Sequence, residues 1–228
     1  MGNALSPGSP EAGGAPEPGG TLKKWSQQGP DSRLWEKTLK TSRLGEMSAL
    51  FLGRGKKLYL VGGAVRDLIR GCEPHDWDLA TDAAPGEVIA MFRDLKPRAA
   101  VIPTGIQHGT VTVRYRGAEF EVTTFRTESD YRDGRHPESV AFALTVEEDL
   151  SRRDFTMNAV ALELPKGKPA DPFGGAKDIR RKIIRCVGDP RERFAEDGLR
   201  PLRAVRFAAQ LGFAVEKPRC RRSALPSA

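Results

Sequence analysis

The sequence predicts an α+β fold, in which most strands precede most helices. Three observations lead to this prediction. A short apolar strand, a Gly-Gly turn, a helix and a second strand follow one another over residues 57–79. Residues 110–125 alternate between apolar and polar side chains with the period of two that strands have. Residues 191–211 are basic and have helical spacing.

The composition fits a globular domain with a polyanionic partner. Of the 228 residues, 39% are hydrophobic and 29% are charged, and the formal net charge is +7. A basic balance favours association with a polyanion such as nucleic acid, although charge does not determine fold. No apolar run approaches the ~18 residues of a membrane span, so we expect no membrane partner.

The cysteines and the N-terminal composition bear on compartment and order. Cys72, Cys186 and Cys220 lie far apart without a CxxC pair. This pattern indicates neither a disulfide framework nor a zinc site and favours a reducing, cytoplasmic compartment. Residues 1–33 are rich in Gly, Pro, Ser and Ala. Such a segment buries too little apolar surface to offset its ordering entropy, so we expect it to be disordered.

The first half of the chain then alternates strands and helices. Helical spacing from Leu34 to Leu52 predicts a helical lead-in. Gly71 is expected to end the first helix of the domain, and Pro85 to stand in the first turn of the next. The expected elements are strand 57–61, helix 64–70, strand 76–79, helix 85–95, and strands 110–115 and 119–125, which flank a turn at Arg116-Gly117.

The second half is expected to be mainly helical. Residues 126–139 are polar, charged and glycine-bearing, which predicts a mobile loop. Residues 146–164 are expected to be mainly helical, residues 171–175 to form a turn, and residues 191–211 to be helical.

Asp76 and Asp78 are the first candidate functional residues. Successive side chains of a strand face opposite sides, so two residues that are two apart point the same way. Two bare carboxylates repel unless a proton or a cation lies between them. Oxygen ligands of this kind suit Mg²⁺, and in a two-metal site the ions activate an attacking hydroxyl and stabilise the leaving group.

Gly62-Gly63 provides a phosphate-binding turn upstream of this pair. Glycines allow a triphosphate to approach the backbone, and the N-terminus of the following helix presents free N–H groups. Arg66 lies one turn into that helix and can reach a phosphate or a sugar. A Gly-Gly pair alone is usually only a turn, and an Asp-x-Asp alone is often a solvated loop. Their occurrence together within residues 60–78 favours a functional site.

A third carboxylate is expected from the hairpin. Glu119 and Glu121 share one face of their strand, so either could approach the metal site. We select Glu121; the alternative is a solvated strand edge.

Polar side chains recur at every third position of the basic helical region: Asp197, Arg200, Arg203 and Arg206. Residues three apart are neighbours on a helix. Leu199, Leu202 and Val205 predict that the opposite face is buried, which leaves the polar stripe facing a cleft or water. The alternative for the stripe is a solvated face or a nonspecific phosphate patch.

The Asp–Arg combination suits the selection of particular bases. An ionised Asp only accepts hydrogen bonds and an Arg only donates them. Cytosine and adenine both offer an amino donor beside an acceptor nitrogen, whereas uracil and guanine present the reverse. Asp197 with Arg200 could therefore accept C and A and leave unpaired polar groups against U and G.

Five ordered segments make the sequence similar to the class II tRNA nucleotidyltransferase and poly(A) polymerase family, within the DNA-polymerase-beta-like superfamily. Together they cover roughly residues 56–217. The segments are Leu60–Asp67, Asp76–Ala83, Arg152–Ala159, Asp171–Gly175 and Glu196–Ala209.

The resemblance implies a head domain with a mixed sheet of about five strands and helices, followed by the beginning of an all-helical neck. We therefore expect five regions: a disordered tail over 1–33, a helical lead-in over 34–55, the head over 56–186, a partial neck over 187–217, and an irregular end over 218–228.

The resemblance also implies roles for particular residues. Asp76 and Asp78 would bind catalytic Mg²⁺. The turn residues Gly62 and Gly63 would contact the incoming nucleotide. Other nucleotide contacts are expected from Arg66, Arg153, Asp154 (at the ribose), Asp197, Arg200, Arg203 and Arg206.

The implied activity is template-independent addition of C and A, from CTP and ATP, to the 3′ end of tRNA. Residues 105–113 and 121–126 resemble CCA-adding enzymes more than poly(A) polymerases, which usually have an arginine-rich stretch there. A poly(A) polymerase and a nucleotidyltransferase acting on a small molecule are alternatives. Another is a truncated, idle nucleotide- or RNA-binding remnant, because the family continues through helical body and tail regions beyond Ala228.

Overall fold

The computed structural model describes residues 32–95, 97–129 and 139–217, without the side chains of 128, 129, 139 and 140. Residues 1–31 of the expected disordered tail and the irregular end lie outside these ranges, as does Cys220. Within the described ranges, no helix is both long and apolar enough to cross a bilayer.

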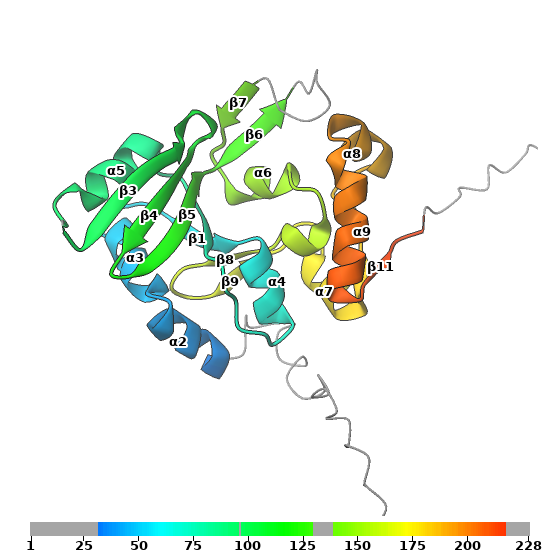
Figure 1. Ribbon diagram of the computed structural model, residues 1–228, viewed down its shortest axis with the longest axis horizontal. Coiled ribbons are helices and arrows are strands. Elements are labelled where there is room, and N and C mark those ends of the chain that lie inside the picture. The colour runs from blue at the N-terminus through cyan, green and yellow to red at the C-terminus, as the bar shows by residue number, and fades with distance from the viewer. Residues whose placement is uncertain (1–31, 96, 130–138, 218–228) are drawn as a thin grey trace, which may run out of the picture.

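A mixed sheet lies at the centre of the molecule (Figure 1). Its strand order is β3-β4-β5-β2-β1-β8-β9, and all neighbours are antiparallel except β2 and β5. This confirms the α+β class, but the sheet has seven described strands where about five were expected. The strands are β1 Leu58–Val61, β2 Asp78–Thr81, β3 Ala99–Gly105, β4 Thr110–Tyr115, β5 Ala118–Thr124, β8 Ala161–Glu163 and β9 Lys168–Ala170.

The strand–turn–helix unit forms as predicted. Gly62 joins β1 to α4 (Gly63–Ile69) at φ +70° and ψ −138°, a backbone conformation that favours glycine. Gly71, at φ +76°, follows the helix end. The predicted strand 76–79 was wrong at its start, because β2 begins at Asp78. Strand β1 ends at Val61, opposite the beginning of β2, so Asp76 has no partner on that side and lies in an irregular segment.

The predicted hairpin is present as β4 and β5. Arg116 and Gly117 form its turn at φ 47° and 83°, and two positive values are typical of the tight turns that match strand twist. The inward-facing side chains Val111, Val113, Phe120 and Val122 are buried in the main core.

Two predictions in the middle of the chain were wrong. Residues 126–139 contain β6 (Arg126–Ser129) and the start of β7 (Ser139–Phe142), which pair antiparallel, rather than a loop throughout. These strands form a separate two-stranded sheet. Their sequence does not alternate between apolar and polar residues, which is the pattern that would have predicted strands.

The predicted helical stretch 146–164 contains only α6 (Val146–Ser151) and the 3₁₀ turn η2 (Thr156–Asn158) as helix. Its last part is β8, which pairs with β1. Val160, Ala161 and Leu162 are all fully buried. A continuously apolar run shows neither the period of a helix nor that of a strand, so the sequence did not distinguish a buried strand from a buried helix.

Helices cover the sheet and extend from one end of it (Figure 1). The lead-in forms two helices, and the basic region is divided at Asp197-Gly198, where α8 gives way to α9. Whether α8 and α9 begin a separate neck stays a prediction, as do the other domain boundaries. The remaining elements are α2 Ser32–Thr41, α3 Leu44–Leu52, α5 Pro85–Arg93, η1 Ile106–His108, α7 Gly175–Arg181, β10 Ile183–Ile184, α8 Pro190–Glu196, α9 Leu199–Leu211 and β11 Ala214–Val215.

The predicted burial of α9 was also wrong. Leu199, Leu202 and Val205 are 41%, 65% and 67% exposed. The buried side chains of the helix are instead Arg200, Ala204 and Phe207. The long stem of an arginine packs like an apolar side chain when its guanidinium finds partners. The side of α9 that bears Arg200 therefore faces the rest of the molecule, whereas Arg206 is exposed.

Candidate active site

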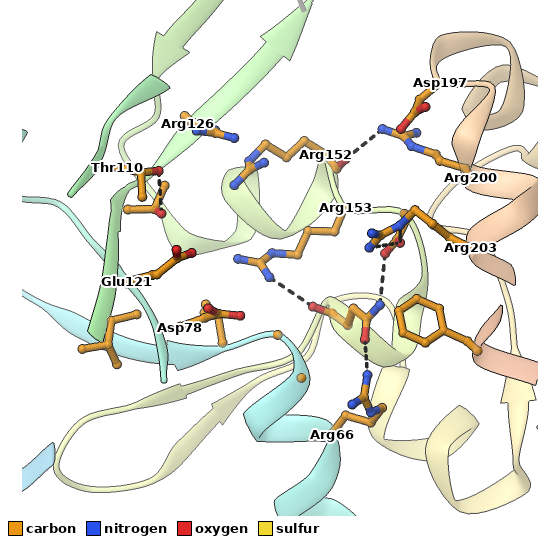
Figure 2. A pocket seen from close by; sticks show the side chains of 18 residues that line it. Arg66, Asp78, Thr110, Glu121, Arg126, Arg152, Arg153, Asp197, Arg200 and Arg203 are labelled. Carbon is orange, nitrogen blue, oxygen red and sulfur yellow. Dashed lines mark hydrogen bonds and ion pairs between the residues drawn. The ribbon is translucent and has the colours of Figure 1, made fainter. Parts of the chain in front are cut away.

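A cavity of about 490 Å³ opens between the sheet, α4, α6, η2 and α9 (Figure 2). All the sequence-predicted site residues line it except Asp76 and Arg206. The complete lining is Val61, Gly62, Gly63, Arg66, Asp78, Leu79, Thr110, Glu121, Thr123, Arg126, Arg152, Arg153, Asp154, Asn158, Asp197, Arg200, Arg203 and Phe207.

Asp78 and Glu121 form the acidic part of the cavity. They lie opposite each other in the parallel register of β2 and β5. Burial raises the pKa of Asp78, the charge of Arg153 opposes this rise, and the charge of Asp76 adds to it. Burial, followed by the charges of Asp78, Glu119 and Asp76, raises the pKa of Glu121. These carboxylates therefore resist ionisation together.

Asp76 is exposed and lies just before β2, outside the cavity lining. Its charge nevertheless acts on both Asp78 and Glu121. Among the described residues, no three His, Cys, Asp or Glu side chains are arranged to hold a metal ion. Two carboxylates with raised pKa values still fit Mg²⁺, which commonly uses one or two carboxylates together with substrate phosphates.

Gly62 brings the backbone turn close to these carboxylates. A Cβ atom on Gly62 would lie 3.1 Å from Asp78 Oδ2 and 3.5 Å from Arg153 Nη1. Any side chain there would occupy the space between the two groups. Glycine at this position therefore keeps the turn, the carboxylate and the guanidinium in close contact.

A chain of hydrogen bonds joins α4 to α9 across the cavity floor (Figure 2). Arg66 Nη1 donates to Asn158 Oδ1 at 3.2 Å, and Asn158 Nδ2 donates to Asp154 Oδ1 at 3.2 Å. Arg203 donates to Asp154 Oδ2 through Nε and Nη2, at 2.8 and 2.7 Å. Asp154 therefore holds Arg203, in addition to any contact with the ribose.

Phe207 forms an aromatic surface for three arginines. The guanidinium carbons of Arg66, Arg203 and Arg206 lie 5.6, 5.5 and 5.0 Å from its ring centroid. Such cation–π contacts contribute roughly 0.5–2 kcal/mol each. Arg206, although outside the cavity lining, is thus close to the arginines that line it.

The expected base-reading residues lie on the same wall, and each has other contacts. Arg200 is 5% exposed and donates to Glu196 Oε2 at 2.6 Å and to the carbonyl oxygen of Arg152 at 3.4 Å. Asp197 Oδ1 accepts from the backbone N–H of Leu199 at 2.8 Å. Their role in selecting bases stays a prediction.

Sequence reasoning missed several polar and aromatic lining residues: Thr110, Thr123, Arg126, Arg152, Asn158 and Phe207. The Arg152-Arg153 doublet was a usable signal for Arg152, and Asn158 stands in the same short segment. Nothing in the sequence next to Phe207 indicated that it lines the site, because its contacts are with arginines that the fold brings around it. Six arginines and four carboxylates line the cavity, so its net charge is +2 and favours an anionic ligand.

Comparisons with known proteins agree with this arrangement. The profile of one family, the poly A polymerase head domain, matches residues 58–185. A CCA-adding enzyme of Geobacillus stearothermophilus is 53% identical over 161 residues, which are 71% of this chain and 38% of that protein. One from Lactobacillus helveticus is 52% identical over 163 residues, 72% of this chain and 39% of that protein.

Solved structures are similar over the same part of the chain. The Bacillus stearothermophilus CCA-adding enzyme in complex with CTP matches with a TM-score of 0.68 and 45% identity, over 78% of this chain and 41% of that chain. The Thermotoga maritima CCA-adding enzyme complexed with tRNA matches with a TM-score of 0.66 and 26% identity, over 83% and 43%. The chain thus spans about two fifths of the length of these relatives.

Proposed function

Because the chain belongs to the family of poly A polymerase head domains, we propose that it is a template-independent tRNA nucleotidyltransferase. It adds C and A from CTP and ATP to the 3′ end of tRNA. The observation that carries this proposal is the pairing of Asp78 with Glu121 in one cavity with the Gly62 turn and six arginines. The CCA-adding relatives support the choice of substrates.

In the proposed reaction, the 3′-hydroxyl oxygen of tRNA loses its proton to solvent and forms a bond to the α-phosphorus of the nucleotide, and the bond between the α-phosphorus and the oxygen that bridges to the β-phosphate breaks and releases pyrophosphate. Asp78, with Asp76 and Glu121 close by, would hold Mg²⁺. Bound there, Mg²⁺ would supply positive charge for the attacking hydroxyl and for the leaving pyrophosphate.

The chain's own residues provide positioning and charge. Gly62 leaves room for the triphosphate beside Asp78. Arg66, Arg153 and Arg203 present guanidinium groups, which bind phosphate oxygens in pairs of parallel hydrogen bonds. Asp197 and Arg200 are proposed to read the base edge, since an acceptor and a donor together match C and A.

The proposal is tested with tRNA that lacks its 3′ CCA, Mg²⁺, and each nucleotide separately. We expect incorporation of C and then A, with U and G rejected. Asp78→Asn should reduce incorporation by at least about 10³-fold, whereas Asp94→Asn, an exposed substitution at the end of α5, should leave it unchanged. Absence of C and A incorporation, or equal use of all four nucleotides, would contradict the proposal.

The same assay distinguishes the alternatives. A poly(A) polymerase would use ATP alone and extend many RNAs. A nucleotidyltransferase acting on a small molecule would be active without RNA. A catalytically idle remnant would bind CTP or ATP without turnover. A cytoplasmic location stays a prediction from the spacing of the cysteines.

A further inference from the structure

Asp149 is a buried carboxylate outside the predicted site and outside the cavity lining. It lies on α6, and its side chain is 0% exposed. Its Oδ1 accepts from Arg152 Nε at 3.0 Å and Nη2 at 2.9 Å, and its Oδ2 accepts from Arg153 Nη2 at 3.0 Å. The backbone N–H of Arg126 also lies 3.4 Å from Oδ1.

The three arginines that meet Asp149 are half of those lining the cavity. Figure 2 shows their side chains following one another along the wall formed by β6 and α6. We call Arg126, Arg152 and Arg153 the arginine wall. One carboxylate thus anchors the guanidinium groups of Arg152 and Arg153 and the backbone of Arg126, although it does not line the cavity.

Asp149 stays ionised despite its burial. Burial alone would raise its pKa, but the charges of Arg153 and Arg152 and their hydrogen bonds lower the pKa below its ordinary value. A buried charge is tolerated only where it is paired and hydrogen-bonded. Arg152 and Arg153 are adjacent in the chain and repel each other, so a carboxylate between them also fixes their separation.

Arg153, which lines the cavity, has guanidinium donors that the described residues do not fully use. Nε of Arg153 is buried and has no hydrogen-bond partner among the described residues. Nη1 of Arg153 has only a long contact, 3.4 Å, to the carbonyl oxygen of Asn158. A guanidinium that is anchored on one side and has remaining donors on the other is suited to bind a phosphate.

We propose that Asp149 is a positioning residue that holds the arginine wall in the orientation that binds phosphate. The phosphate belongs either to the triphosphate of the nucleotide or to the backbone of the RNA. Only this identification of the ligand rests on the proposed function. The inference goes beyond the proposed function because Asp149 touches neither substrate.

Charge and position make opposite predictions for Asp149→Asn. If Asp149 acted only through its charge, neutralising it would make the cavity more positive and phosphate binding tighter. If it positions the arginines, binding becomes weaker. We expect the Kd for inorganic tripolyphosphate or for tRNA, measured by calorimetry without turnover, to rise about tenfold, as for the loss of one charge-assisted hydrogen bond. A rise for tripolyphosphate assigns the wall to the nucleotide, and a rise for tRNA alone assigns it to the RNA.

Asp149→Glu is the second variant. It keeps the charge and moves the carboxylate by one methylene, so it separates position from charge even if Asp149→Asn does not fold. In steady-state assays, KM for CTP or tRNA should rise about tenfold while kcat stays within about twofold. Partial unfolding would instead lower kcat and leave KM unchanged.

Glu46→Gln is the control. Glu46 pairs with two arginines, Arg43 and Arg116, and none of these three residues lines the cavity. Its loss removes a carboxylate that pairs with two arginines without touching the arginine wall, so Kd and KM should not change. Unchanged or tighter phosphate binding in both Asp149 variants would overturn the inference even if nucleotide transfer is demonstrated. Weaker binding in a protein without transfer activity would support the inference while contradicting the proposed function.

Discussion

At the scale of single residues, Asp78 and Glu121 are an unfavourable pair in the absence of a cation. They lie opposite each other in β2 and β5, and burial raises the pKa of both carboxyl groups; the charge of Asp76 adds to the rise at Asp78, and the charge of Asp78 adds to the rise at Glu121. When the pKa of a carboxyl group is higher in the folded than in the unfolded protein, the folded state is more stable with that group protonated. Its contribution to stability is therefore complete below the unfolded pKa, near 4, and is lost as pH rises through the folded value.

This sign leads to a prediction for Asp78→Asn. In metal-free protein at neutral pH, the substitution should raise the melting temperature by about 2 °C, because a partly exposed pair repels by no more than roughly 1 kcal/mol. The difference should disappear near pH 4. Added Mg²⁺ should raise the melting temperature of the unsubstituted protein but not of the variant, as thermal denaturation with and without a chelator would measure. A lower melting temperature for the metal-free variant would contradict this account.

At the scale of elements, the contact between α7 and η2 keeps Asn158 in place on the cavity floor. Gly175 begins α7, and the atom nearest to the position that a Cβ would take there belongs to the backbone. A Cβ atom at this position would lie 2.0 Å from the carbonyl oxygen of Thr156 and 2.6 Å from a methyl group of Val160. Two oxygens of Asp171 fix the same turn by accepting from the backbone N–H groups of Gly175 and Ala176, at 2.6 and 3.0 Å.

We predict that Gly175→Ala lowers the free energy of unfolding by about 3 kcal/mol or more, since backbone cannot move aside as a flexible side chain can. Gly86→Ala is the control. Gly86 lies in the first turn of α5, and, apart from the adjacent residues and the backbone of its own helix, no atom lies within 4 Å of the position that a Cβ atom would take there. Alanine at this position should add about 0.5 kcal/mol by reducing the freedom of the unfolded chain. Urea denaturation of both variants tests the pair; equal stabilities would exclude the steric explanation.

At the scale of the whole molecule, both the complete chain and the cavity lining have a net positive charge. The chain carries a formal net charge of +7, and the cavity lining carries +2. Binding of a polyanion to such a surface releases counterions, so affinity falls as salt rises.

We predict that tRNA affinity falls about 10²-fold between about 50 and about 200 mM salt, as expected for roughly four phosphate contacts. Arg152→Gln should remove one phosphate contact and so reduce the slope of log Kd against log salt concentration by about one. Fluorescence anisotropy of labelled tRNA measures both quantities. An affinity independent of salt would exclude phosphate contacts as the main source of binding.

The sequence by itself determined the features that depend on neighbouring residues. The Gly62 turn, the hairpin at Arg116-Gly117 and the Pro85 helix start form where local backbone preferences placed them. Gly62, Gly63 and Asp78 line one cavity, because β1, α4 and β2 are consecutive along the chain, whereas their role in binding metal and triphosphate stays a prediction.

Only the tertiary structure decided which faces are buried and which distant residues meet. Leu202 is exposed and Arg200 buried on α9, the reverse of the prediction from apolar spacing, because partners from elsewhere in the chain satisfy the arginine. Ala161–Glu163 became a strand because β1 was available to pair with it. Asn158 and Asp149 acquired their contacts in the same way. Periodicity describes the two sides of an element, but its burial depends on what packs against each side, and no local pattern encodes that.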